Sequence, residues 1–474
     1  MRRSRLLAVA VSTATVAALG AAVGGTSVAR TSAASAVSRA NASVVVHPQV
    51  ILLKSAPSAT AQTTAQCRAQ LQISCYNAHQ IEQAFGTPQL YSQGITGAGE
   101  TIVIVDSFGS PTIQSDLASF DAGMGLPAPP SFTVIQPAGP VPPYHPNGLR
   151  INWVAETSLD VEYSHAIAPG ANIVLVETPV AETEGEHGFP EILEAENYVI
   201  KHHLGIVMSQ SFGATEETFP SPQTILAQRA TYRAAAAAGI TVTASTGDDG
   251  AANVKRNGSD FYRSPVVGWP ASDPLVTAVG GTQLHLDAAG NAGRPANAWN
   301  DTYNKSLLEA FTGSTTPSPF STGGGDSHVF ARPFWQNGVK GVVGEHRGIP
   351  DISMSGACDG SVDVFLGPPG VTPGFYLVCG TSEASPEFAG IVALTAQAAG
   401  HPLGLINPAL YKMSAAGDAG IVDVTKGDNT VSFMQDGAMH TVHGFDAGTG
   451  YDKATGVGTL WAPDFVPELA AAAG

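Results

Sequence analysis

The residues best suited to chemistry in this sequence are a serine in a glycine turn, Ser382, and two carboxylates far upstream, Glu156 and Asp160. Ser382 follows Gly380 and Thr381 and precedes an apolar, alanine-rich run. This order predicts a loop that feeds a buried helix, with the serine in the first helical turn. Backbone N–H groups there have no intrahelical partner and could stabilise an oxyanion. Most serines in such turns only cap a helix, so the assignment depends on the accompanying residues.

Glu156 and Asp160 fall one turn apart on a helix that we expect from about residue 152 to 166. In an exposed helix this spacing would simply give a solvated acidic face. Here the neighbouring residues are apolar, which favours partial burial. A partly buried carboxylate pair tends to hold one proton between its members. Such a pair could act as the base, and as the group that orients the base, for a nucleophilic serine.

The order of further motifs resembles that of the sedolisins, the serine-carboxyl peptidases with a subtilisin-like fold. The resemblance extends from about residue 75 to 469. It rests on Glu156-x-x-x-Asp160 with His165-Ala-Ile-Ala-Pro169, Ser209-Gln-Ser-Phe-Gly213, Ser245-Thr-Gly-Asp248-Asp-Gly250, Trp269-Pro-Ala-Ser-Asp-Pro274, Val279-Gly-Gly-Thr282, Gly323-Gly-Gly-Asp-Ser327, Arg332-Pro-Phe-Trp-Gln336, Pro350-Asp351 and Gly380-Thr-Ser382. It implies that Ser382 is the nucleophile, Glu156 its general base, and Asp160 the residue that orients Glu156.

The resemblance also places Asp248 in the oxyanion hole. A protonated carboxyl can donate a hydrogen bond to the oxyanion, whereas an ionised one would repel it, so this role implies acidic working conditions. Without the resemblance, Asp248 would be interpreted as an ordinary turn residue. The sequence departs from many sedolisins at Asp106, where they have glutamate, and at Phe212, where they have tryptophan. Both positions surround the triad and bear on efficiency and substrate preference.

A subtilisin mechanism is the natural alternative, because the strand that ends at Asp106 resembles the aspartate strand of that family. Subtilisins need a His-Gly-Thr-His helix soon afterwards, and none of the 13 histidines occurs in such a setting. We therefore reject a histidine base. His165, five residues past Asp160, is expected to pack or to form a hydrogen bond at the end of its helix.

A second candidate site lies near the C terminus, where Asp423-Val424 is followed by Gly448-x-Gly450-x-Asp452. Calcium takes six or more oxygen ligands, and carboxylates mixed with backbone carbonyls suit it. Glycines allow the backbone to turn such carbonyls inward. The resemblance implies one Ca²⁺ ion, held by the side chains of both aspartates and the carbonyls of Val424, Gly448 and Gly450. Without the resemblance, Gly-x-Gly-x-Asp would be a plain turn.

The N terminus is typical of an exported protein. Three arginines precede an apolar, alanine-rich stretch from Leu6 to about Val23, and no later segment is apolar and long enough to span a membrane. We predict a signal peptide over residues 1–36 and a Ser/Ala/Thr-rich leader over 37–74. The peptidase domain, with its calcium site, is expected over 75–474. This leader is much shorter than the folded prodomain that sedolisins commonly carry.

The four cysteines, an even number, fit two disulfides in an oxidising compartment, and we expect the protein to be secreted. Three pairings are possible. Cys67–Cys75 and Cys358–Cys379 are the local ones, and the second would brace the strand that leads to Ser382. Free, buried cysteines are the alternative.

The elements that must position these residues alternate along the chain. Alternation of β-runs with helices predicts an α/β fold, a subtilisin-like parallel sheet covered by helices on both faces. The β-runs are Thr101–Val105, Asn172–Val176, Gly205–Met208 and Ile240–Ala244, and the helical stretches include Glu191–His202 and Ala227–Ala238.

The net charge of the chain limits the classes of partner that the protein can bind. The formal net charge is −17, from 22 Lys and Arg against 39 Asp and Glu, which argues against nucleic acid and anionic membranes. We expect a monomeric, calcium-dependent endopeptidase that acts on proteins or peptides. The alternative is a sedolisin-fold binding protein that has lost activity. The complete set of Ser382, Glu156, Asp160 and Asp248 favours the enzyme.

Overall fold

The computed structural model of the protein describes residues 51–52 and 58–473. They belong to a unit that spans Ser43–Gly474. The predicted signal peptide lies outside the described residues. So does the predicted leader up to residue 57, apart from residues 51–52.

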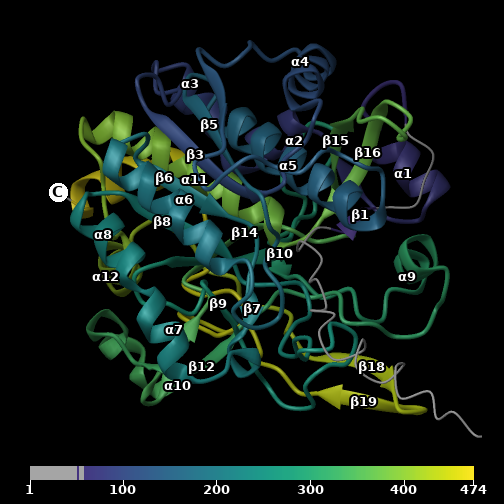
Figure 1. The fold of residues 1–474 in the computed structure, drawn as a ribbon, viewed down its shortest axis with the longest axis vertical. Helices are drawn as coiled ribbons and strands as arrows, with labels where there is room; N and C mark the ends of the chain where they lie inside the picture. The colour runs from purple at the N-terminus through teal and green to yellow at the C-terminus, as the bar shows by residue number, and fades with distance from the viewer. Residues whose placement is uncertain (1–50, 53–57, 474) are drawn as a thin grey trace, which may run out of the picture. The chain divides into compact units, whose positions relative to one another are not determined.

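The central sheet has the strand order β11-β10-β8-β6-β3-β5-β4, with β14 paired to β10 (Figure 1). All neighbouring strands run parallel except β10 and β11. The predicted parallel sheet is therefore confirmed. Its strands are β3 (Thr101–Ser107), β4 (Phe132–Ile135), β5 (Asn172–Thr178), β6 (Val207–Gln210), β8 (Thr241–Ser245), β10 (Thr277–Gln283), β11 (Asn297–Ala298) and β14 (Ile352–Ser355).

Helices cover both faces of this sheet. Successive residues of a strand point to opposite faces, so each strand contributes apolar side chains to both helical layers. In β3, Ile102 and Ile104 join one buried cluster, together with apolar residues of α5 (Gly148–Ile167) and α11 (Thr381–Ala399). Val103 and Val105 join another, with residues of α6 (Phe189–His202). The buried strand is thus apolar at every position from Ile102 to Val105, as a two-sided parallel sheet requires.

One predicted helix differs from the structure. Residues 227–238 do not form one helix, because the chain is divided into α7 (Pro222–Gln228) and α8 (Ala230–Ala237). Arg229 lies at the junction, and its guanidinium forms an ion pair with Asp273, with Nε 2.7 Å from Oδ2. Residues 227–238 contain neither glycine nor proline, so the sequence marks no boundary between the two helices.

The remaining elements surround this layered core. They are β1 (Ile51–Leu52), α1 (Thr64–Gln70), β2 (Cys75–Tyr76), α2 (Ala78–Phe85), α3 (Thr87–Tyr91), α4 (Ile113–Met124), β7 (Ala214–Thr215), β9 (Gly268–Trp269), α9 (Lys305–Thr312), β12 (Gly325–Ala331), α10 (Lys340–Val343), β13 (His346–Ile349), β15 (Ser361–Leu366), β16 (Gly374–Cys379), α12 (Asn407–Ala416), β17 (Ile421–Val422), β18 (Val431–Gln435), β19 (Ala438–Val442), β20 (Thr459–Leu460) and α13 (Ala462–Ala473), with 3₁₀ turns at Glu216–Thr218 and Phe334–Val339. No helix of the described residues is long and apolar enough to cross a membrane.

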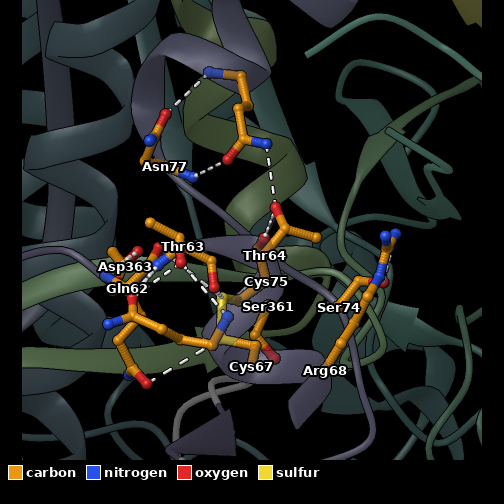
Figure 2. Close-up of a disulfide and its surroundings, with 12 residues drawn as sticks. Gln62, Thr63, Thr64, Cys67, Arg68, Ser74, Cys75, Asn77, Ser361 and Asp363 are labelled. Carbon is orange, nitrogen blue, oxygen red and sulfur yellow. Dashed lines mark hydrogen bonds between the residues drawn. A yellow bond between two sulfur atoms is a disulfide. The ribbon is translucent and has the colours of Figure 1, made fainter. Parts of the chain in front are cut away.

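A second sheet, in the order β1-β16-β15-β2, carries both disulfides. The bridges are Cys67–Cys75 and Cys358–Cys379, so the local pairing is confirmed. Figure 2 shows the first bridge beside Thr64, whose hydroxyl donates to the carbonyl of Cys75 at 2.8 Å. Residues 58–74 of the predicted leader thus contain α1 and Cys67, one partner of the first disulfide. They lead into β2, which pairs with β15.

The two helices that carry the predicted triad pack closely against each other. A Cβ added to Gly390 of α11 would lie 2.7 Å from the Cβ of Ile167 of α5. Only glycine permits this approach without movement, and the approach sets the distance between α5 and α11.

Candidate active site

The predicted catalytic residues converge at the carboxyl edge of the parallel sheet. Glu156 and Asp160 lie on α5, Asp248 follows β8, and Ser382 lies in the first turn of α11. All are buried; Asp248, the most exposed of them, has 9% of its surface accessible. Ligand sites of α/β sheets form where strands of this edge meet helix N-termini.

The local sequence explains the position of Ser382. Gly380 precedes the helix with φ 128° and ψ 168°, a conformation that L-residues avoid, and Thr381 is the first helical residue. Ser382 therefore enters the helix where backbone N–H groups lack intrahelical acceptors. The predicted loop-to-helix turn is confirmed.

Glu156 faces Ser382 and Asp160. Burial raises the pKa of Glu156 well above its usual range, and the charge of Asp160 raises it further. The neighbouring Ser382 side chain acts in the opposite direction and lowers that pKa. Both carboxyl oxygens of Glu156 are buried without a hydrogen-bond partner of normal geometry among the described residues. A carboxylate beside a serine hydroxyl can accept its proton when the two groups come within hydrogen-bond distance.

Asp160 is held from a neighbouring strand. The hydroxyl of Ser211, just after β6, donates to Oδ1 of Asp160 at 2.9 Å. Burial raises the pKa of Asp160 well above its usual range, and the charge of Asp106 at the end of β3 adds to this. Asp106 is itself fully buried, and burial raises its pKa to about 7.

Asp248 contacts Thr381, the residue before Ser382. Its Oδ1 accepts hydrogen bonds from the backbone N–H of Thr381 at 2.7 Å and from the Thr381 hydroxyl at 2.9 Å. Its Oδ2 is buried and has no hydrogen-bond partner among the described residues. Burial raises the pKa of Asp248 well above its usual range, which favours the protonated acid. A protonated Oδ2 would be a hydrogen-bond donor available to a reacting oxygen.

The sequence did not reveal the contacts that three further residues make in this site. Ser211 lies in a motif that carries the family resemblance, but only the structure brings it to Asp160. Thr381 links the turn to Asp248. Asp106 belongs to the carboxyl cluster, because its charge raises the pKa of Asp160 and of Glu156. Each of these interactions joins residues at least 50 positions apart, beyond the reach of local patterns.

Two other predicted positions lie beside the site. Phe212 is fully buried and packs against Phe189, with ring centroids 6.4 Å apart. His165 is buried at the end of α5, and its Nε2 lies 2.7 Å from the carbonyl oxygen of Pro127. Burial lowers its pKa. The prediction that His165 forms a hydrogen bond at the helix end, outside the triad, is confirmed.

The predicted calcium ligands lie in adjoining loops. Asp423 accepts a hydrogen bond from the N–H of Gly450 at 2.9 Å, and Asp452 accepts one from Gly448 at 2.9 Å. The set thus offers two carboxylates beside backbone carbonyls, and Val424 is buried next to Asp423. Among the described residues there is no cluster of three or more His, Cys, Asp or Glu suited to a metal. The hard oxygens present still fit an ion that accepts carbonyl ligands.

The chain is similar to known proteins of one family. The model of the family described as Subtilase family matches residues 152–435. Kumamolisin from Bacillus sp. (strain MN-32) is 31% identical over 392 residues, which cover 81% of this chain and 62% of kumamolisin. Tripeptidyl-peptidase 1 from Pongo abelii is 29% identical, over 64% of this chain and 50% of that protein. The chain therefore spans less than two thirds of the length of these relatives.

A solved structure is also similar. The structure of Pseudomonas sedolisin, a serine-carboxyl proteinase complexed with two molecules of pseudo-iodotyrostatin, superimposes with a TM-score of 0.70. It is 25% identical to this chain, and the match covers 84% of this chain and 99% of that one.

Proposed function

The chain belongs to the subtilase family and, within it, to the sedolisins, and on this basis we propose that it is a serine-carboxyl peptidase active in acid. In this proposal Ser382 is the nucleophile and Glu156 its general base. Asp160 orients Glu156, and Asp248 donates a hydrogen bond to the oxyanion.

The observation that supports the proposal most is the crowding of carboxyls around Ser382. Asp106, Glu156, Asp160 and Asp248 are buried together, and no ion pair of the described residues includes any of them. Such a group retains protons, because several uncompensated charges in one buried site repel one another. The Ser382 side chain lowers the pKa of Glu156 against the effect of burial, and in this proposal Glu156 is the member that ionises.

The chemistry follows from these states. As Ser382 Oγ attacks a substrate carbonyl carbon, its proton passes to Glu156. The carbonyl oxygen becomes an oxyanion and receives a hydrogen bond from protonated Asp248. Collapse of the tetrahedral intermediate expels the amine, which takes the proton from Glu156 and leaves an acyl-enzyme. A water molecule then attacks the acyl-enzyme as Glu156 takes its proton. The second tetrahedral intermediate collapses, which releases the carboxylic acid product and returns the proton to Ser382.

Replacement of Ser382 by alanine, with a matched serine control, tests this proposal. Ser385 lies one turn further along α11, and its hydroxyl contacts those of Ser209 and Thr243, each at 3.1 Å. Ser382→Ala should abolish peptide hydrolysis at pH 4, whereas Ser385→Ala should keep it. Undiminished hydrolysis by purified, folded Ser382→Ala would refute the assignment.

We further propose endopeptidase action on proteins and peptides, by a monomer. Because tripeptidyl-peptidase 1 is among the similar proteins, exopeptidase action is the second candidate. Mass spectrometry of the early products of a long peptide with a blocked N terminus separates the two. Internal cleavage supports the endopeptidase, whereas tripeptides released only from the unblocked peptide support the exopeptidase.

Secretion and a resident calcium ion are also proposed. The two buried disulfides are compatible with an oxidising compartment. The residues that would hold calcium are Asp423 and Asp452 through their carboxylates, and Val424, Gly448 and Gly450 through their carbonyls. The ion would neutralise the two aspartates and fix the loop, away from bond cleavage.

A further inference from the structure

A covalent cross-link acts on the turn directly before the nucleophile. Cys379 is the last residue of β16, three positions ahead of Ser382, and it is bonded to Cys358 in the loop that follows β14. Both half-cystines are fully buried. The bridge therefore constrains the backbone that enters the site, and not a remote part of the chain.

The loop that carries Cys358 contacts the same turn a second time. The N–H of Gly380 donates to the carbonyl of Gly356 at 2.9 Å. A Cβ added to Gly356 would lie 2.9 Å from the Gly380 carbonyl oxygen and 3.2 Å from the Cα of Gly281. The two segments thus close a small ring, with a hydrogen bond at one end and the disulfide at the other.

The oxyanion aspartate holds the opposite side of the turn. Thr381 donates to Asp248 through its N–H and its hydroxyl, and that hydroxyl accepts a hydrogen bond from Gly247 at 3.0 Å. Ser382 therefore follows a segment that is anchored to Cys358 on one side and to Asp248 on the other. A displacement of about 1 Å in a reacting group can lower a rate about 10²-fold. Freedom at Gly380 would misplace Ser382 and Asp248 together.

The other disulfide offers a comparison within the same molecule. Cys67–Cys75 is equally buried and belongs to the same apolar cluster as Cys358 and Cys379. It stabilises the segment around α1, which joins β15 through β2 and not the turn at Gly380. Figure 2 shows its neighbours, which come from that segment and from β15.

We propose that the Cys358–Cys379 disulfide is a positioning element of the active site, and that the dithiol form is a folded but poorly active peptidase. The proposal rests on the proposed function of Ser382. To form the bridge, the two thiols lose two protons and two electrons to a disulfide oxidant such as oxidised glutathione, which is released as two thiols. The site therefore reaches its full rate only in an oxidising compartment.

Paired alanine variants test this proposal. Cys358→Ala with Cys379→Ala should lower kcat about 10- to 100-fold and leave KM nearly unchanged, because the defect lies in alignment. Cys67→Ala with Cys75→Ala should leave kcat nearly unchanged. Both variants should lose thermal stability, so stability alone cannot account for a difference in kcat between them. An unchanged kcat in the first variant, or equal losses in both, would overturn the proposal.

Reversible reduction of the Cys358–Cys379 bridge tests the same proposal without replacing either cysteine, so the test holds even if the paired alanine variant does not fold. The Cys67→Ala, Cys75→Ala protein contains a single bridge. Dithiothreitol under mild denaturation, followed by return to native buffer, should lower kcat, and oxidised glutathione should restore it. A folded, reduced protein with full kcat contradicts the proposal.

Amide hydrogen exchange separates this proposal from the peptidase assignment. Reduction should speed exchange in the peptide that covers residues 374–388 and leave that of β3 unchanged. This result would support positioning even if no substrate were cleaved, a finding that would count against the proposed function alone. Unchanged exchange in 374–388 would count against positioning whatever the activity.

Discussion

The proposed attack by Ser382 needs two neighbouring carboxyls in opposite states, Glu156 ionised and Asp248 protonated. Burial raises the pKa of both well above the usual range, while the Ser382 side chain lowers that of Glu156 and the hydrogen bonds from Thr381 lower that of Asp248. Their surroundings differ, because Oδ1 of Asp248 is engaged by Thr381, which leaves Oδ2 to carry a proton, whereas Glu156 lies beside the serine whose proton it would take. In the proposed mechanism these surroundings give the two acids different roles, as in other hydrolases with paired carboxyls.

Substitution of Asp248 tests the oxyanion role. Asp248→Ala should lower kcat about 10²- to 10³-fold, the usual effect of losing one oxyanion donor. Asp248→Asn should lose less, because its amide can accept from Thr381 through one atom and donate through the other. Its activity should also persist to higher pH, since the amide does not titrate. A pH–rate profile of Asp248→Asn that matches the wild type would contradict this role.

At the scale of elements, α5 and α11 must keep their distance for Glu156 to reach Ser382. Gly390→Ala should destabilise the protein by about 1–3 kcal/mol and lower kcat, because the new methyl group would press on Ile167 at 2.7 Å. Gly148, in the first turn of α5, has nothing within 4 Å of an added Cβ, so Gly148→Ala should be neutral or slightly stabilising. Urea unfolding and steady-state kinetics measure both effects. Equal behaviour of the two variants would contradict this explanation.

The sequence predicts a helix or strand well where the pattern that defines it lies within a few neighbouring residues. The strands at Thr101, Asn172 and Ile240 were expected within a few residues, because buried parallel strands are apolar throughout. The break at Arg229 was not, since residues 227–238 contain no glycine or proline that would mark the end of a helix. The same holds in the site: the motif around Ser382 indicated the turn, but the contact of Ser211 with Asp160 depends on the tertiary fold.

At the scale of the whole molecule, buried carboxyls without cations favour stability in acid. Burial raises the pKa of Glu182, Glu184 and Glu196 to about 8. The folded state therefore binds more protons than the unfolded chain. The stability that these groups contribute is complete below their unfolded pKa of about 4.3 and is lost as pH rises toward 8.

Urea unfolding at pH 4, 6 and 8 should show this loss. Each such carboxyl can lower the free energy of unfolding by up to ~1.4 kcal/mol per pH unit within that window. Glu196→Gln should flatten the dependence, because Glu196 is fully buried and accepts a hydrogen bond from Gln210. Stability that rises from pH 5 to pH 8 would contradict the linkage.

Calcium should stabilise the folded molecule as a whole. A ligand that binds only the native state raises stability by mass action, so excess chelator should lower the melting temperature. Asp423 is exposed, and Asp423→Ala should remove the chelator-sensitive part of the stability at little other cost. Equal chelator effects on both proteins would exclude Asp423 as a ligand. No chelator effect, together with no calcium in elemental analysis of the native protein, would reduce the loop to a plain turn.

In the proposed mechanism Ser382 attacks carbonyl carbons when Asp248 is protonated and Glu156 is ionised, and a peptide aldehyde reports this attack. With a ¹³C-labelled aldehyde carbon, NMR distinguishes the free aldehyde from a hemiacetal with the protein. A hemiacetal should form with the wild type in acid and be lost near neutrality, and none should form with Ser382→Ala. A hemiacetal that forms with Ser382→Ala, or none with the folded wild type in acid, would contradict this mechanism.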